Sequence, residues 1–518
     1  MSTAKRVIKN TGILYIRMLV TMFISLYTTR IILSALGIAD FGIFNLVAGA
    51  IAMLTFLNNA MAGASQRFIS YAEGAGDIGK VKKVFNVSVV LHLIIAGAVL
   101  LILEIGGFFL LQHLKIPGNR IGATQFIYQF MIVSTLFTII SVPYDALINA
   151  HENMMLVAIL GIAEAFFKLG IAIYITYTSF DKLVIYGLLT AASSILLLIA
   201  KRIYCHKKYA ECEVNIKKYY SKTIFKEMTG FAGWTFMGSA SAVVASYGQG
   251  IVMNMFFGTV VNAAQAITNQ VSGQLGAFAG MMLKALNPVI AKSEGAKDRS
   301  AMLRATMMGS KFSSLLLMFF FIPVLIETPF IFSVWLDKTP DYAIIFCRLY
   351  LIQNLIAQLY VTFGATISAV GNIRNYQLTI TFTTALPLLV SYILFKMGFD
   401  AYWLYIIFIL FAFVRFGSGL YYTNKYCNLS VSDFFKKVVL IVSVVFIITL
   451  GFASIPLIFL EKSWLRLLCV CIMSTIGFIS ALWITGLNKT EKNMILDIIK
   501  LGYYKVFQKS YIKSQKVL

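Results

Sequence analysis

The sequence predicts an all-α polytopic membrane protein with about 14 membrane-spanning helices. Of its 518 residues, 59% are hydrophobic and 13% are charged, and the mean hydropathy is +0.83. An ordinary soluble domain has about 25% charged residues. A charged fraction this low over a chain this long indicates a protein that lies largely in the bilayer.

Each expected span is an apolar segment of about 20 residues or more, the length that crosses the hydrocarbon core. The first follows the N-terminus without a small-residue cleavage site, so we expect an uncleaved span rather than a signal peptide. The segments lie near 11–36, 42–63, 84–111, 124–146, 152–178, 182–204, 228–257, 261–285, 311–335, 343–370, 376–397, 401–424, 437–459 and 463–486.

The basic residues behind the net charge of +23 are distributed unevenly between the two sides of the predicted topology. When the connections between spans are assigned alternately to two sides, most basic residues fall on the side of the N-terminus. The positive-inside rule then predicts that both termini are cytoplasmic. Anionic lipids are the expected partners of this charge, and nucleic acid is not. The basic clusters on this side are Lys5–Lys9, Arg67–Lys83, Lys201–Lys226, Lys284–Lys311, Lys425–Lys437 and Lys489–Lys516.

Cysteine and histidine give no sign of a metal site. The six cysteines are scattered without a CxxC pair, and the chain has four histidines. This pattern predicts neither a disulfide framework nor a metal centre. We expect no cofactor.

Residues 71–80, YAEGAGDIGK, match the GxxxxGK part of a phosphate-binding loop, but Val81 replaces the Ser or Thr that would hold Mg²⁺. The segment also follows a predicted transmembrane helix rather than a strand. Glu73-Gly74-Ala75 and Asp77 recur as Glu294-Gly295-Ala296 and Asp298, at an offset of 221 residues. The second copy lacks the GK pair, so we interpret both as turns between helices.

The same offset relates Gly37 to Gly258 and predicts an internal repeat. Six spans separate the copies, and an even number returns the chain to the same side, so both halves have one orientation. We expect an N-lobe (1–215), a C-lobe (216–428), two additional helices (429–490) and a basic cytoplasmic tail (491–518). Such repeats commonly enclose a central site that faces alternate sides.

Residues 33–77, and above all LGIADFGIFNLV, resemble the polysaccharide transporter family of the MOP superfamily. These are the Wzx-type flippases of O-antigen and other lipid-linked oligosaccharides. The resemblance implies a MATE-like fold of six, six and two helices. It also implies translocation of undecaprenyl-diphosphate-linked oligosaccharide from the cytoplasmic to the outer leaflet of a bacterial inner (plasma) membrane, driven by an H⁺ or Na⁺ gradient. A polysaccharide polymerase or ligase is a possible partner, as in lipopolysaccharide biosynthesis.

Five basic residues lie inside the predicted spans, where each costs about 3 kcal/mol at the bilayer centre. Such residues usually face a cavity or a partner, and an anionic diphosphate would need a cationic path. We expect Lys168, Arg415 and Arg17 to line that path. For Arg30 and Arg348, which lie nearer the outer interface, extension to the headgroups is an equal alternative.

Two acidic residues are candidates for ion coupling. Glu164 precedes Lys168 by one helical turn, so the two can pair. The pair could simply neutralise itself, or Glu164 could bind H⁺ or Na⁺ and free the lysine. Glu104, towards the outer end of its span, is the second candidate.

Amides can bind sugar hydroxyls. Gln265 and Asn269 lie one turn apart in the eighth span, so they could line a glycan path. Hydrogen bonding between helices is an equally good explanation.

Two other functions can be compared with the flippase: a small-molecule exporter and a membrane enzyme. A MATE-like exporter of small cations would favour buried carboxylates over buried bases. A membrane polymerase or glycosyltransferase would usually need a large outer loop or a DxD motif, and the sequence shows neither, so we expect no enzymatic activity.

Overall fold

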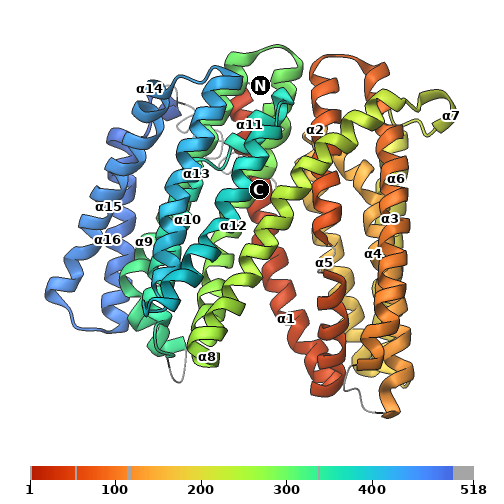
Figure 1. Ribbon diagram of the computed structural model, residues 1–518, viewed down its shortest axis with the longest axis horizontal. Coiled ribbons are helices and arrows are strands. Elements are labelled where there is room, and N and C mark those ends of the chain that lie inside the picture. The colour runs from red at the N-terminus through yellow and green to blue at the C-terminus, as the bar shows by residue number, and fades with distance from the viewer. Residues whose placement is uncertain (1–2, 53–54, 114–117, 336–338, 490, 494–518) are drawn as a thin grey trace, which may run out of the picture.

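The computed structural model is a bundle of long helices (Figure 1). It describes residues 3–52, 55–113, 118–335, 339–489 and 491–493, so most of the predicted tail lies outside the described residues. The helices are α1 (Thr3–Ala52), α2 (Thr55–Gly74), α3 (Ile78–His113), η1 (Gly118–Arg120), α4 (Ile121–Ala150), α5 (Met154–Tyr177), α6 (Lys182–Lys208), α7 (Ile216–Tyr219), α8 (Lys222–Gly295), α9 (Arg299–Trp335), α10 (Ala343–Leu359), α11 (Phe363–Val370), α12 (Arg374–Lys396), α13 (Trp403–Cys427), α14 (Val431–Phe434), η2 (Phe435–Val439), α15 (Leu440–Phe459), α16 (Trp464–Ala481) and η3 (Leu482–Gly486).

Eleven helices in the described part are long and apolar enough to cross a membrane, which confirms the polytopic all-helical class. The expected spans that do not meet this criterion are 42–63, 228–257 and 261–285. The last two are rich in small residues and amides, which lower the hydropathy. They belong to α8, which lies in the middle of the bundle (Figure 1).

Gly37 and Gly258 occupy equivalent positions in the structure. Each interrupts one long helix, α1 or α8, with φ near +76° and +75° and ψ of 170° and −167°, respectively. Only glycine adopts this backbone region readily. The chain reverses direction at both points (Figure 1), so the two glycines predicted to correspond by sequence offset make the same sharp turn.

The repeated Glu-Gly-Ala turns also correspond. Gly76 and Lys297, again 221 residues apart, both have positive φ (71° and 58°). In the first copy, the backbone N–H of Lys80 donates to Asp77 Oδ1 at 2.8 Å. In the second, the N–H of Ala301 donates to Asp298 Oδ1 at 2.9 Å. An aspartate therefore caps the next helix in both copies and occupies the N–H that a phosphate would need.

The two turns meet where α2 crosses α8. A Cβ on Gly74 would lie 2.1 Å from the carbonyl oxygen of Lys292, and one on Gly295 would lie 2.0 Å from that of Tyr71. Residues 71 and 292 are themselves related by the repeat offset, so the contact is reciprocal. We call this end of the bundle, with both Glu-Gly-Ala turns, the EGA end. Glycine is required here because the two backbones approach too closely for any side chain.

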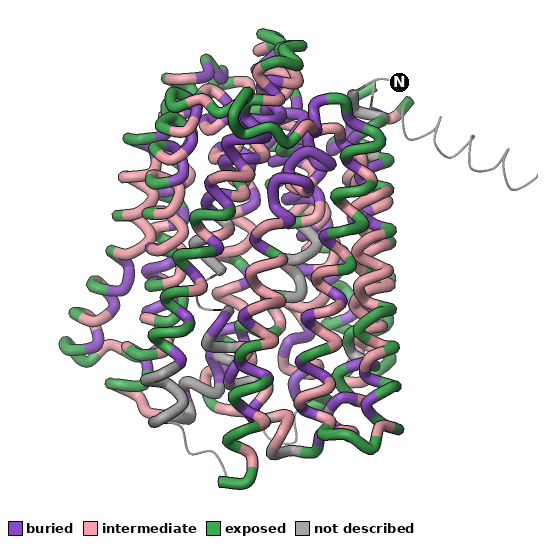
Figure 2. The backbone as a smooth tube through the Cα atoms, turned by 90° about the vertical axis from the view of Figure 1, so that its right-hand side faces the viewer, coloured by how far each residue is buried: buried purple, intermediate pink, exposed green. Residues whose placement is uncertain are grey.

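Among the described residues, hydrophobic packing joins the two halves of the chain mainly at the EGA end, with a further small cluster of Leu14, Met154 and Ala285. One core cluster contains residues of both halves, among them Phe68 of α2 and Val289 of α8. A second large cluster lies within residues 245–481, and a third within residues 32–186. Buried segments gather accordingly in the upper part of the bundle, near the N-terminus (Figure 2).

Two buried ion pairs attach the C-terminal helices to α9. Arg466, in α16, binds both carboxylate oxygens of the fully buried Glu327 at 2.8 and 2.9 Å. At the EGA end of α9, Lys311 Nζ lies 2.7 Å from Glu491 Oε2 and donates to the carbonyl oxygen of Gly486 at 3.0 Å. Because one pair lies at each end, α15 and α16 are fixed to the second half of the chain.

We predict that Gly74→Ala weakens the contact between α2 and α8. The added methyl would overlap the Lys292 carbonyl, and overpacking of this kind costs about 1–3 kcal/mol. The melting temperature of the purified protein should fall. Gly63→Ala, in the same helix, is the control because nothing lies within 4 Å of its added Cβ. Equal melting temperatures for the two variants would contradict the assignment.

Candidate functional site

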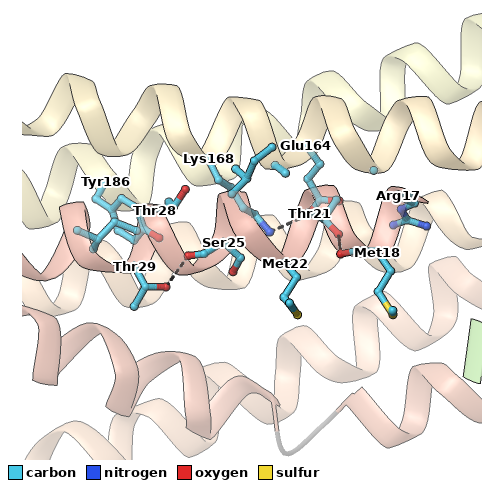
Figure 3. A pocket seen from close by; sticks show the side chains of 14 residues that line it. Arg17, Met18, Thr21, Met22, Ser25, Thr28, Thr29, Glu164, Lys168 and Tyr186 are labelled. Atoms are coloured by element: carbon cyan, nitrogen blue, oxygen red, sulfur yellow. Dashed lines mark hydrogen bonds and ion pairs between the residues drawn. The ribbon is translucent and has the colours of Figure 1, made fainter. Parts of the chain in front are cut away.

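A cavity of about 790 Å³ lies between α1 and α5. Figure 3 shows polar and charged side chains from both helices pointing into it, with Tyr186 of α6 at one end. Along α1 the lining runs from residue 17 to residue 32, roughly 22 Å of helix. The lining residues are Arg17, Met18, Thr21, Met22, Ile24, Ser25, Thr28, Thr29, Ile32, Gly161, Glu164, Ala165, Lys168 and Tyr186.

Helical periodicity explains why these residues converge. On α1 the lining positions recur every three or four residues, and on α5 residues 161, 164, 165 and 168 do the same. Such positions share one face of an α-helix. Serine and threonine make the α1 face polar: Thr21 and Thr29 donate to backbone carbonyls one turn earlier, at 3.1 and 2.9 Å. The buried hydroxyl of Thr28 has no hydrogen-bond partner in the described structure.

Arg17 enters the cavity because residue 161 is glycine. A Cβ at Gly161 would lie 2.1 Å from Arg17 Nε and 2.4 Å from Nη2. The guanidinium therefore rests directly on the backbone of α5. Among the described residues no carboxylate lies within ion-pair distance of it. The result is a positive charge at one end of the cavity with donors left for a ligand.

Lys168 and Glu164 form an ion pair at the middle of the cavity. Lys168 Nζ lies 2.7 Å from Glu164 Oε1, and the side chains are 48% and 41% exposed. An ion pair this exposed contributes little to stability, typically 0–1 kcal/mol. Either partner can therefore change its interactions at small cost. The structure thus brings together three sequence-predicted residues, Arg17, Glu164 and Lys168, and places two cations against one carboxylate.

A further group of charges near Arg17 was not predicted from the sequence. Lys284, half-buried in α8, lies within electrostatic range of Arg17 and of the Asp145–Lys201 pair, whose Nζ–Oδ2 distance is 2.8 Å. Lys284 lies at the end of the expected span 261–285 and was counted with the basic residues of the connection that follows, whereas α8 continues to Gly295. A signal was present, because residues 281–283 and 285–286, on either side of Lys284, are apolar and the next glycine is Gly295.

The other three predicted basic residues lie outside this cavity. Arg30 is exposed on α1, on a different face from Arg17. Arg415 is 9% exposed, and its Nε donates to the Tyr360 hydroxyl at 3.2 Å. Substrate binding by Arg30 and Arg415 stays a prediction.

Arg348 donates hydrogen bonds to backbone carbonyls of α9. Pro329 lacks an N–H, so the carbonyl of Leu325, four residues earlier in α9, has no helical donor. Arg348 Nε donates to that carbonyl at 3.0 Å, and Nη2 donates to the carbonyl of Ile326 at 3.1 Å. Its place beside a smaller hollow at residues 339–348 leaves substrate binding as a prediction.

The amides and Glu104 also lie apart from the cavity. Gln265 is buried and its Nε2 donates to Gln249 Oε1 at 3.4 Å, within α8, whereas Asn269 is exposed. Glu104 accepts a hydrogen bond from Gln129 Nε2 at 3.1 Å and is exposed. Their predicted roles in glycan binding and ion coupling remain predictions. Within the described residues, no group of three or more His, Cys, Asp and Glu side chains could hold a metal ion.

No model of a protein family matches the chain, and no curated protein sequence matches it. Solved structures do. An outward-facing multidrug resistance MATE family transporter of the MOP superfamily is 13% identical with a TM-score of 0.70, over 82% of this chain and 96% of the other. The chain has a MATE-like fold.

Two further structures share this fold. One is a MOP superfamily transporter from Pyrococcus furiosus described as having a binding pocket of reverse polarity (14% identity, TM-score 0.67, 81% and 96% coverage). The other is a mutant of the Vibrio cholerae MATE transporter VcmN (16% identity, TM-score 0.66, 82% and 97% coverage). These similar structures are transporters, not enzymes.

We predict that Gly161→Ala displaces Arg17 and weakens binding of an anionic probe such as inorganic pyrophosphate. Loss of a hydrogen bond between charged groups, about 1.5–3 kcal/mol, corresponds to roughly tenfold weaker binding or more. Calorimetric titration of the purified protein measures it. Gly170→Ala, in the same helix with open space around its Cβ, should bind as the native protein does. Native affinity in Gly161→Ala would show that Arg17 does not contact the probe.

Proposed function

We propose that the protein is a flippase that carries undecaprenyl-diphosphate-linked oligosaccharide from the cytoplasmic to the outer leaflet of a bacterial inner membrane by alternating access. The observation that carries the proposal is the charge of the cavity. Arg17 and Lys168 face one carboxylate, Glu164, so the cavity has a net positive charge suited to a diphosphate. The resemblance of residues 33–77 to the polysaccharide transporters supports the same cargo.

The MATE-like fold supports transport but not the choice of cargo. Its relatives include a multidrug resistance transporter and one whose pocket has reversed polarity. A small-molecule exporter is therefore the second candidate, favoured by the first of these structures. Cationic drugs would be repelled by Arg17 and Lys168, which is why we prefer the anionic cargo.

The predicted topology gives the direction of transport. If the basic EGA end is cytoplasmic, as the positive-inside rule predicts, the described conformation is closed on the cytoplasmic side and faces outward. Both termini are then cytoplasmic. A diphosphate headgroup released from the cavity would leave towards the outer leaflet while its lipid tail stays in the membrane. A polysaccharide polymerase or ligase there would use the product.

Arg17→Ala and Lys168→Ala should each reduce flipping at least about tenfold, because each removes a cation that contacts the diphosphate. The measurement is translocation of a fluorescent polyprenyl-diphosphate oligosaccharide in proteoliposomes. Lys182→Ala, which removes a charge at the start of α6 outside the cavity, is the control. Native rates in both cavity variants would refute the proposed path.

Glu164→Gln should uncouple transport from the ion gradient while the protein still folds. The amide cannot bind H⁺ or Na⁺ as a carboxylate does, and it no longer neutralises Lys168. Flipping should therefore proceed at the same rate with and without an imposed gradient. A variant that still responds fully to the gradient would remove Glu164 from the coupling mechanism.

A further inference from the structure

The EGA end contains two cations that each cross from one half of the chain to the other. Arg67 of α2 reaches the C-terminal end of α11. Its Nε and Nη2 donate to the carbonyl oxygens of Ser368 and Ala369, both at 2.8 Å. These carbonyls belong to the negative end of the helix dipole, where a cation is favourable.

The same guanidinium is enclosed by aromatic rings and glycine. It lies 4.5 Å from the ring centre of Phe68 and 5.5 Å from that of Phe231, on opposite halves of the chain. A Cβ on Gly371, which ends α11 with φ of +95°, would lie 3.0 Å from Arg67 Nη2. The site therefore fits a planar cation closely.

Lys292 of α8 reaches in the opposite direction, from the second half of the chain to the first. Its Nζ lies 2.7 Å from Glu73 Oε1 in α2 and 3.7 Å from Glu152 Oε1, which follows α4. The Glu152 side chain is 3% exposed and also pairs with Arg6 of α1 at 2.7 Å. Lys292 therefore contacts two carboxylates of the first half at once, one of them buried, which favours the closed arrangement of this end.

His151 strengthens the acidic side of this bridge. Its two ring nitrogens face Glu73 Oε1 at 3.2 Å and Glu211. Burial opposes a charge on the ring, but the hydrogen bonds to Glu211 and Glu73 outweigh it and raise the pKa of His151 to about 9. His151 therefore holds the Glu73 side chain in place to receive Lys292.

We propose that Arg67 and Lys292 form a reciprocal lock that holds the EGA end closed and must release before that end can open. The proposal rests on the proposed function, because only a transporter needs this end to open. The lock is confined to one end of the molecule. The two other large cores each lie within one half, so loss of the lock should separate the halves without unfolding either.

The experiment measures the distance between spin labels at Lys83→Cys in α3 and Arg304→Cys in α9, two exposed positions at the EGA end. It uses full-length protein without cargo. Lys292→Met and Arg67→Met should each increase the ratio of open to closed molecules at least about fivefold, and the double variant should increase it further. Lys297→Met, an exposed lysine of the adjacent turn, should leave the distances unchanged.

A native distance distribution in both single variants would overturn the lock. So would a lower melting temperature with unchanged distances, because it would show that the two cations only stabilise the fold. Neither result depends on the cargo. The lock proposal can therefore be contradicted without contradicting the proposed flippase function, and the reverse also holds.

Discussion

The structure depends on positive charges that are held inside a membrane protein without full neutralisation. A bare cation in hydrocarbon is expensive, by about 3 kcal/mol or more at the bilayer centre. Arg17 nevertheless lacks a carboxylate partner in the described structure, and Lys168 shares an exposed one. Water in a cavity of about 790 Å³ can solvate both. The cavity is therefore what makes these residues tolerable, and an anion that replaces this water would be bound strongly.

The internal repeat explains where the cavity can form. Gly37 and Gly258 turn the two halves in the same way, and Gly74 and Gly295 let them touch at one end. Reciprocal cations, Arg67 in one direction and Lys292 in the other, then close that end. Because the two other large cores each lie within one half, the halves can move relative to one another once this contact releases, as alternating access requires.

The sequence predicted features that follow from periodicity and repetition. The helical class and the repeat of Gly37 at Gly258 both appear in the structure. Of the three cations expected to share a path, Arg17 and Lys168 line one cavity with Glu164, whereas Arg415 lies outside it. Features set by tertiary contacts were not predictable. The approach of Lys284 to Arg17 is one example, because it depends on how α8 packs against α1. Arg348 donates a hydrogen bond to the carbonyl of Leu325, which lacks a helical donor because Pro329 has no N–H. Only the packing of α9 shows this contact.

The sign of the cargo's charge tests the central claim most directly. Equilibrium binding to the native protein can be compared at low and high salt for a soluble polyprenyl diphosphate analogue and for a lipophilic cation of similar size. The account predicts that the diphosphate binds and is displaced by salt, whereas the cation does not bind at the cavity. Tight binding of the cation, with no measurable affinity for the diphosphate, would contradict it.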